Sequence, residues 1–103
     1  MAVSESVIRE KQEKFVECVE EELKRQRQLH PDVHPSIEHS LFVLLEEVHE
    51  LKDELYKKEH WRSIADIHEE ACQIAASAIR LMVDCDIRKD QGYKHHEHYK
   101  HAA

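Results

Sequence analysis

A chain of 103 residues is long enough for one domain, and its single Gly and two Pro argue against a β-rich fold and for long helices. Because only 41% of the residues are hydrophobic and 6% aromatic, such helices bury a thin core, and we expect them to assemble into a homo-oligomer. The formal charge of −7 disfavours nucleic acids and anionic membranes as partners.

The first expected helix spans about residues 4–29, with Ser4 or Ser6 as its N-cap. Its apolar stripe is narrow, and charged residues occupy the remaining faces. Two prolines then follow within residues 30–36, where they cannot lie inside a helix. This segment is therefore predicted to be a rigid connector.

The second helix is expected to begin after Ser36, because apolar residues recur at spacings of three and four as far as Leu55. The pattern is lost near residues 57–62. It resumes after Ser63, which forms a capping-box pattern with Asp66. The fold class predicted from these patterns is all-α, an antiparallel bundle of three main helices.

The third helix is expected to end near Ile87, so that residues 1–87 form an all-α domain and residues 88–103 form a polar, His-rich tail. The tail contains His95, His96, His98 and His101. Such a cluster is typical of a solvated segment, although it can also bind transition metals.

The first fourteen residues lack the apolar region of a signal peptide, and no apolar run is long enough to span a membrane. The three cysteines are widely spaced and odd in number, which favours free thiols. We therefore expect a cytoplasmic protein.

Several acidic residues fall on or beside the apolar stripes of the second and third helices. Glu47 is three residues after Leu44 and shares its face, and Glu46 and Glu50 lie near it. Glu70 falls on the stripe of the third helix, with Gln73 one turn later. If these helices pack antiparallel, the two acidic sets can face one another.

Carboxylates crowded in a partly dry cleft repel each other unless a proton or a cation neutralises them. Mg²⁺ prefers oxygen ligands and also takes oxygens from a substrate's phosphates. The pattern is therefore consistent with a Mg²⁺ site, with Mn²⁺ as an alternative ion, that is suited to hydrolysis of a phosphoanhydride. The alternative from spacing alone is that these glutamates face solvent, as most pairs of adjacent glutamates on helices do.

Basic and aromatic residues near this predicted site are candidates for holding the substrate. Arg80 lies two turns after Gln73 on the same helical face, where its guanidinium could bind a polyphosphate, although a plain surface role is the alternative. Lys52 is a further candidate near the mouth of the site. Trp61 either packs at the end of the bundle or stacks on a nucleobase.

The segments LLEEVHEL and EEACQIAA, within about residues 36–86, resemble the MazG-like all-α nucleoside triphosphate pyrophosphatases, whose pattern is EExxE followed by ExxD. The resemblance implies a Mg²⁺-dependent enzyme that forms a dimer or a dimer of dimers and cleaves a nucleoside triphosphate into monophosphate and pyrophosphate. It also implies roles for particular residues: Glu47, Glu50 and Glu70 as metal ligands, Gln73 at the fourth position, and Glu46 as a ligand or as the catalytic base.

Two departures from the family pattern favour an alternative. Gln73 replaces an Asp, which removes one negative charge, and His49 replaces a Gly that is frequent in the family. The alternative is a nucleotide-binding or helical protein-interaction module that does not hydrolyse its ligand. Glu46 and His49 also form half of a di-iron motif, but the third helix lacks the second ExxH that such a site needs.

Overall fold

The computed structural model describes residues 1–57 and 59–92 of the chain. Their secondary structure comprises three long α-helices and one 3₁₀ turn, in the order α1 (Glu5–Leu29), α2 (Ile37–Tyr56), η1 (Glu59–Trp61) and α3 (Ile64–Asp90). These described residues contain no β-strand, which confirms the all-α prediction. The predicted histidine cluster of the tail lies outside the described residues.

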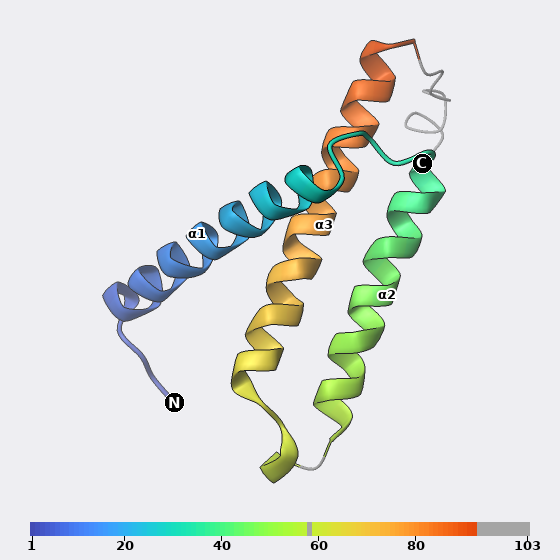
Figure 1. Cartoon of the computed structure of the whole chain (residues 1–103). Coiled ribbons are helices and arrows are strands. Elements are labelled where there is room, and N and C mark those ends of the chain that lie inside the picture. The colour runs from blue at the N-terminus through green and yellow to red at the C-terminus, as the bar shows by residue number, and fades with distance from the viewer. Residues whose placement is uncertain (58, 93–103) are drawn as a thin grey trace, which may run out of the picture.

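The helices α2 and α3 lie side by side and run antiparallel, whereas α1 crosses α3 obliquely near the connector (Figure 1). Within the described part of the chain, α1 packs against α3 and not against α2. The N-terminal half of α1 diverges from the pair (Figure 1). The long axis of the molecule therefore follows α2 and α3, and α1 packs against α3 alone.

Each long helix begins at a serine whose side chain accepts a backbone N–H of the first turn. Ser4 accepts from Val7 at 3.4 Å, and Ser36 accepts from His39 at 3.0 Å. Ser63 accepts from the backbone N–H of Asp66 at 3.1 Å, as the capping-box pattern predicts. These caps place the starts of the helices within a residue of the predicted positions, and α3 continues three residues beyond its predicted end at Ile87.

The turn between α2 and α3 is held by Glu54, which is only 7% exposed. Its carboxylate accepts the backbone N–H of Ser63 at 2.8 Å and the ammonium of Lys57 at 2.6 Å. The reciprocal bond of a capping box would use that same Ser63 N–H, and here Glu54 from the preceding helix takes it. A buried carboxylate thus ties the end of α2 to the start of α3.

The connector between α1 and α2 is tied to α3 by a second polar cluster. Asp84 is 4% exposed and accepts the hydroxyl of Ser40 at 3.0 Å and the backbone N–H of His34 at 3.3 Å. The Nδ1 atom of His34 lies 2.6 Å from the Ser40 Oγ. Arg88 donates to the backbone carbonyl of His34 from the next turn of α3. Burial, together with the nearby charge of Arg80, lowers the pKa of His34, which keeps its ring neutral at pH 7.

Apolar burial contributes little to this chain on its own. Among the described residues, the only buried hydrophobic residue is Ala76. The radius of gyration is 17.1 Å, whereas a compact domain of this length has a value of about 13 Å. No helix in the described ranges is long and apolar enough to cross a membrane.

We predict that Asp84→Ala destabilises the fold by about 2 kcal/mol, because the buried donors of Ser40 and His34 lose their acceptor. Urea denaturation followed by circular dichroism measures this loss. Asp86→Ala, an exposed position on the same helix, is the matched control. Equal stabilities of the two variants would show that the Asp84 cluster does not hold the connector.

Candidate functional site

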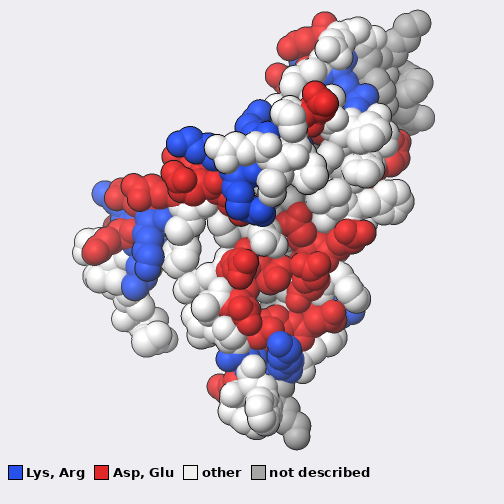
Figure 2. Space-filling model, in the orientation of Figure 1, with Lys and Arg blue, Asp and Glu red and all other residues white. Residues whose placement is uncertain are grey.

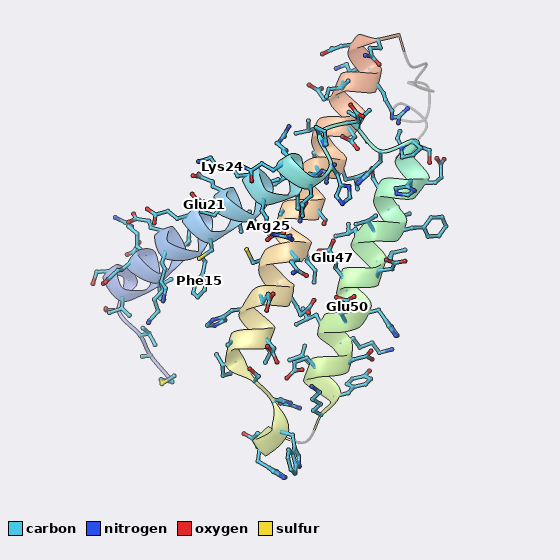
Figure 3. The ribbon with its side chains drawn as sticks, viewed as in Figure 1. Phe15, Glu21, Lys24, Arg25, Glu47 and Glu50 are labelled. Carbon is cyan, nitrogen blue, oxygen red and sulfur yellow. The ribbon has the colours of Figure 1, made fainter. Side chains whose placement is uncertain are left out.

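The predicted acidic residues of α2 and α3 meet along the seam between these two helices. Glu47 and Glu50 leave α2 on the side that faces α3 (Figure 3). Glu70 and Gln73 of α3 are half-buried, as is Glu47. Asp and Glu side chains gather over the middle of the α2–α3 pair (Figure 2). The antiparallel packing therefore brings Glu47, Glu50, Glu70 and Gln73 to one region.

Glu47 is oriented by a hydrogen bond from across the seam. The buried hydroxyl of Ser77 on α3 donates to its Oε1 atom at 2.5 Å. The other oxygen, Oε2, is buried and has no hydrogen-bond partner among the described residues. A buried carboxylate oxygen without a donor is costly, so this atom is suited to receive a proton or a cation.

Glu70 is in the same situation, because its Oε2 atom is also buried and has no partner within the described part of the chain. Burial, the close approach of the Glu50 carboxyl group and the charges of Glu50, Glu69 and Glu47 raise the pKa of Glu70. A hydrogen bond between these two carboxyl groups would require one of them to carry a proton, because two carboxylates offer acceptors alone. Burial likewise raises the pKa of Glu47, against the opposing effect of the Ser77 hydrogen bond.

A cleft of about 630 Å³ opens beside these carboxylates. Its volume lies in the range of small-molecule binding sites. Glu47, Glu50 and Gln73 line one part of it, and the connector lines another part with apolar, imidazole and one acidic side chain. This connector end is lined by His30, Pro31, Asp32, Val33, His34 and Pro35, together with His39 and Val43 of α2. Glu70 does not line the cleft, but it is close enough to Glu50 for that carboxyl group to raise its pKa.

The other predicted site residues are placed differently. Arg80 lines the cleft, but it is only 7% exposed and its Nη2 atom donates to the backbone carbonyls of His30 and Asp32, each at 3.4 Å. Its hydrogen bonds therefore stabilise the connector. Glu46 is exposed and does not line the cleft; together with Phe42, Leu45, His49 and Glu50 it borders a shallow hollow on α2.

The two remaining candidates for substrate contact also lie away from the cleft. The ammonium of Lys52 lies 5.3 Å from the ring centroid of Tyr56 on the same helix. Trp61 is 68% exposed in η1, at the turn between α2 and α3. Neither residue is part of the lining of the cleft.

The described carboxylates are not arranged as the ligands of a metal ion. Within residues 1–57 and 59–92, no three His, Cys, Asp or Glu side chains converge closely enough to hold a metal. Ligation of one ion by Glu47, Glu50 and Glu70 therefore requires their side chains to turn toward it. The two unpartnered oxygens are the atoms that such a rotation would satisfy.

Two residues with clear roles at the site were missed in the sequence. Ser77 belongs to the run of small residues on α3, which suggested only close helix packing. Arg25 of α1 lines the cleft, and its position depends on the angle at which α1 crosses α3. The spacing of Ser77, thirty residues after Glu47, contains no signal that the two side chains meet.

Comparisons with models of protein families, with curated proteins and with solved structures found no match to this chain. The resemblance to the MazG-like family therefore remains a prediction from the sequence motifs.

We predict that Glu70→Gln stabilises the metal-free protein at pH 7.5. A raised folded-state pKa penalises the fold at pH values above it, and this penalty disappears below the ordinary value of 4.5. The gain in Tm of a few degrees should therefore shrink as the pH falls from 7.5 toward 4.5, as thermal melts can measure. Asp86→Asn, an exposed carboxylate of the same helix whose charge does not contribute to the raised pKa of Glu70, is the control. A pH-independent difference between Glu70→Gln and the wild type would contradict the electrostatic cause.

Proposed function

We propose that this protein hydrolyses nucleoside triphosphates to the monophosphate and pyrophosphate in a Mg²⁺-dependent reaction. The observation that carries the proposal is the meeting of Glu47, Glu50 and Glu70 beside a cleft of about 630 Å³, with buried oxygens of Glu47 and Glu70 lacking any partner among the described residues. The order of the acidic residues in the chain, EExxE and then ExxQ, supports it further.

The donor set fits a hard divalent cation. Carboxylate oxygens are the ligands that Mg²⁺ prefers, and the amide oxygen of Gln73 can complete the set without adding charge. Glu47, Glu50 and Glu70 would hold the ion, and Ser77 would keep Glu47 in place. When bound, Mg²⁺ supplies charge neutralisation for the phosphates and acidifies a bound water.

The proposed reaction requires an attacking water, a base and a place for the nucleoside. In the proposed reaction, a water oxygen attacks the α-phosphorus, the bond between the α-phosphorus and the bridging oxygen breaks, and pyrophosphate leaves. A carboxylate of the cluster accepts the proton of the attacking water. Glu46 does not line the cleft, so we assign the role of the base to one of the carboxylates Glu47, Glu50 and Glu70. The connector end of the cleft, with its prolines and imidazoles, would hold the nucleoside.

A second candidate function is nucleotide binding without hydrolysis. Two observations favour it: Gln73 lowers the negative charge of the site, and no described trio of side chains is yet arranged around an ion. Such a module would sequester its ligand or use its helices for protein contacts. Tight binding of a nucleotide in a calorimetric titration, with no product, distinguishes it from the enzyme.

We also propose that the chain functions as a homo-oligomer. The outer face of α2 (Leu41, Phe42, Leu45 and Val48) is apolar and exposed, with Phe42 at 65% and Leu45 at 50%. These residues recur at helical spacing and form a stripe on the side that α3 does not cover. Because Ala76 is the only buried hydrophobic residue described, a second copy seated on this face would supply the missing core.

We predict that the purified protein with Mg²⁺ releases pyrophosphate from at least one member of a panel of canonical and modified nucleoside triphosphates. Glu70→Gln should lower kcat by at least about a hundredfold, because electrostatic stabilisation by a bound ion is a large part of such catalysis. Asp86→Asn, at an exposed position of α3, should retain wild-type activity. Ion-exchange chromatography of the products measures both, and the absence of pyrophosphate from every nucleotide would refute the hydrolase.

We predict that the wild-type protein is a dimer or larger by light scattering and that Leu45→Lys shifts it toward the monomer with reduced helicity. A lysine on the outer face of α2 would have to be buried without a counter-charge in the assembly. Met82→Lys, at an exposed apolar position of α3, is the matched control. A wild-type protein that remains monomeric at high concentration would contradict the proposed assembly.

A further inference from the structure

Two guanidinium groups line the cleft, and they differ in what they can reach. Arg80 is 7% exposed and its Nη2 atom donates to the carbonyls of the connector. Arg25 comes from α1, and its side chain remains 53% exposed. It extends from α1 across α3 toward the side on which Glu47 lies (Figure 3). Arg25 is therefore the cleft's accessible arginine.

The guanidinium of Arg25 is held in a fixed orientation by Glu22, one turn earlier on α1. Its Nε atom donates to Glu22 Oε1 at 2.8 Å, and its Nη2 atom donates to Glu22 Oε2 at 2.6 Å. Glu22 is itself mostly buried and accepts a third bond from Gln26 at 2.9 Å. This arrangement reduces the entropy that Arg25 would lose on binding a ligand.

Part of the guanidinium remains available for a ligand. An arginine side chain has five N–H donors, and Glu22 engages two of them. Across residues 1–57 and 59–92, Glu22 is the only hydrogen-bond partner of this group. Three donors are therefore free to point into the cleft.

The surroundings decide what kind of anion this group can accept. The carboxylates of Glu22, Glu47 and Glu50 also line the cleft, so a free anion entering it would meet their negative charge. A bound divalent cation at the carboxylates removes that repulsion and itself binds phosphate oxygens. Planar guanidinium groups bind phosphate through paired hydrogen bonds.

We propose that Arg25 is the phosphate-binding residue of the cleft and holds the pyrophosphate part of the substrate while the carboxylates hold the metal. This inference rests on the proposed function, since the anion enters only with the divalent cation. It also assigns α1 a part in the site, although α1 contacts α3 alone among the other described helices. Arg25 acts on ligand affinity and does not take part in proton transfer.

Calorimetric titration with inorganic pyrophosphate in the presence of Mg²⁺ tests the proposal without requiring turnover. The wild type should bind, and Arg25→Gln should bind at least about tenfold more weakly, because charge-assisted bonds are lost. Arg25→Lys keeps the charge without the planar fork and should recover part of the affinity. Arg27→Gln, two residues away on a different face of α1, is exposed and outside the lining of the cleft, so it should bind as the wild type does.

Equal affinities of Arg25→Gln and the wild type would overturn the proposal, as would a loss of equal size in Arg27→Gln or a wild type that does not bind. The two proposals can fail separately. If no nucleotide is hydrolysed but pyrophosphate binding still depends on Arg25, the hydrolase is refuted and the phosphate site stands. If nucleotides are hydrolysed and Arg25→Gln has an unchanged KM, the hydrolase stands and the phosphate site is refuted.

Discussion

Glu47, Glu50 and Glu70 repel one another at the seam of α2 and α3. A pair of free helices would relieve this repulsion by rotating or separating, so that the carboxylates reach water. Polar ties at both ends of the pair oppose that relief. Glu54 fixes the turn after α2, and Asp84 fixes the connector before it. The helices are thus held in a register that keeps the acidic groups together.

This arrangement also explains the distribution of polar and apolar residues. The buried positions of the described chain are largely polar or charged, and the apolar residues of α2 lie mainly on its outer face. A monomer built this way gains little from the hydrophobic effect, which ordinarily dominates folding. The proposed second copy and the proposed metal are therefore complementary: one would supply apolar burial, and the other would neutralise the charge at the seam.

The sequence predicts the helices well because their limits are local. Serine caps, the two prolines of the connector and the three-to-four spacing of apolar residues all act within a few positions. The acidic side chains of α2 that face α3 are predictable for the same reason, since Glu47 shares the stripe of Leu44. Glu46 is offset from Glu47 by about 100° around the helix, and it does not line the cleft. The EExxE motif does not show that only the second of its two adjacent glutamates lines the cleft.

Tertiary contacts determined what the sequence could not predict. The role of Ser77 requires the register of α3 against α2, and that of Arg25 requires the angle of α1. The spacing of Arg80 after Gln73 predicts that its side chain faces a ligand, and Arg80 does line the cleft. Its hydrogen bonds to the connector, about fifty residues away in the chain, arise only from the folded path.

We infer that a divalent cation occupies the seam between α2 and α3. Anomalous diffraction from crystals of the protein soaked with Mn²⁺ would locate such an ion. A peak is expected between Glu47, Glu50 and Glu70, with the two unpartnered carboxylate oxygens turned toward it. A map that has no peak at this position, with these carboxylates in bulk water, would refute the metal site.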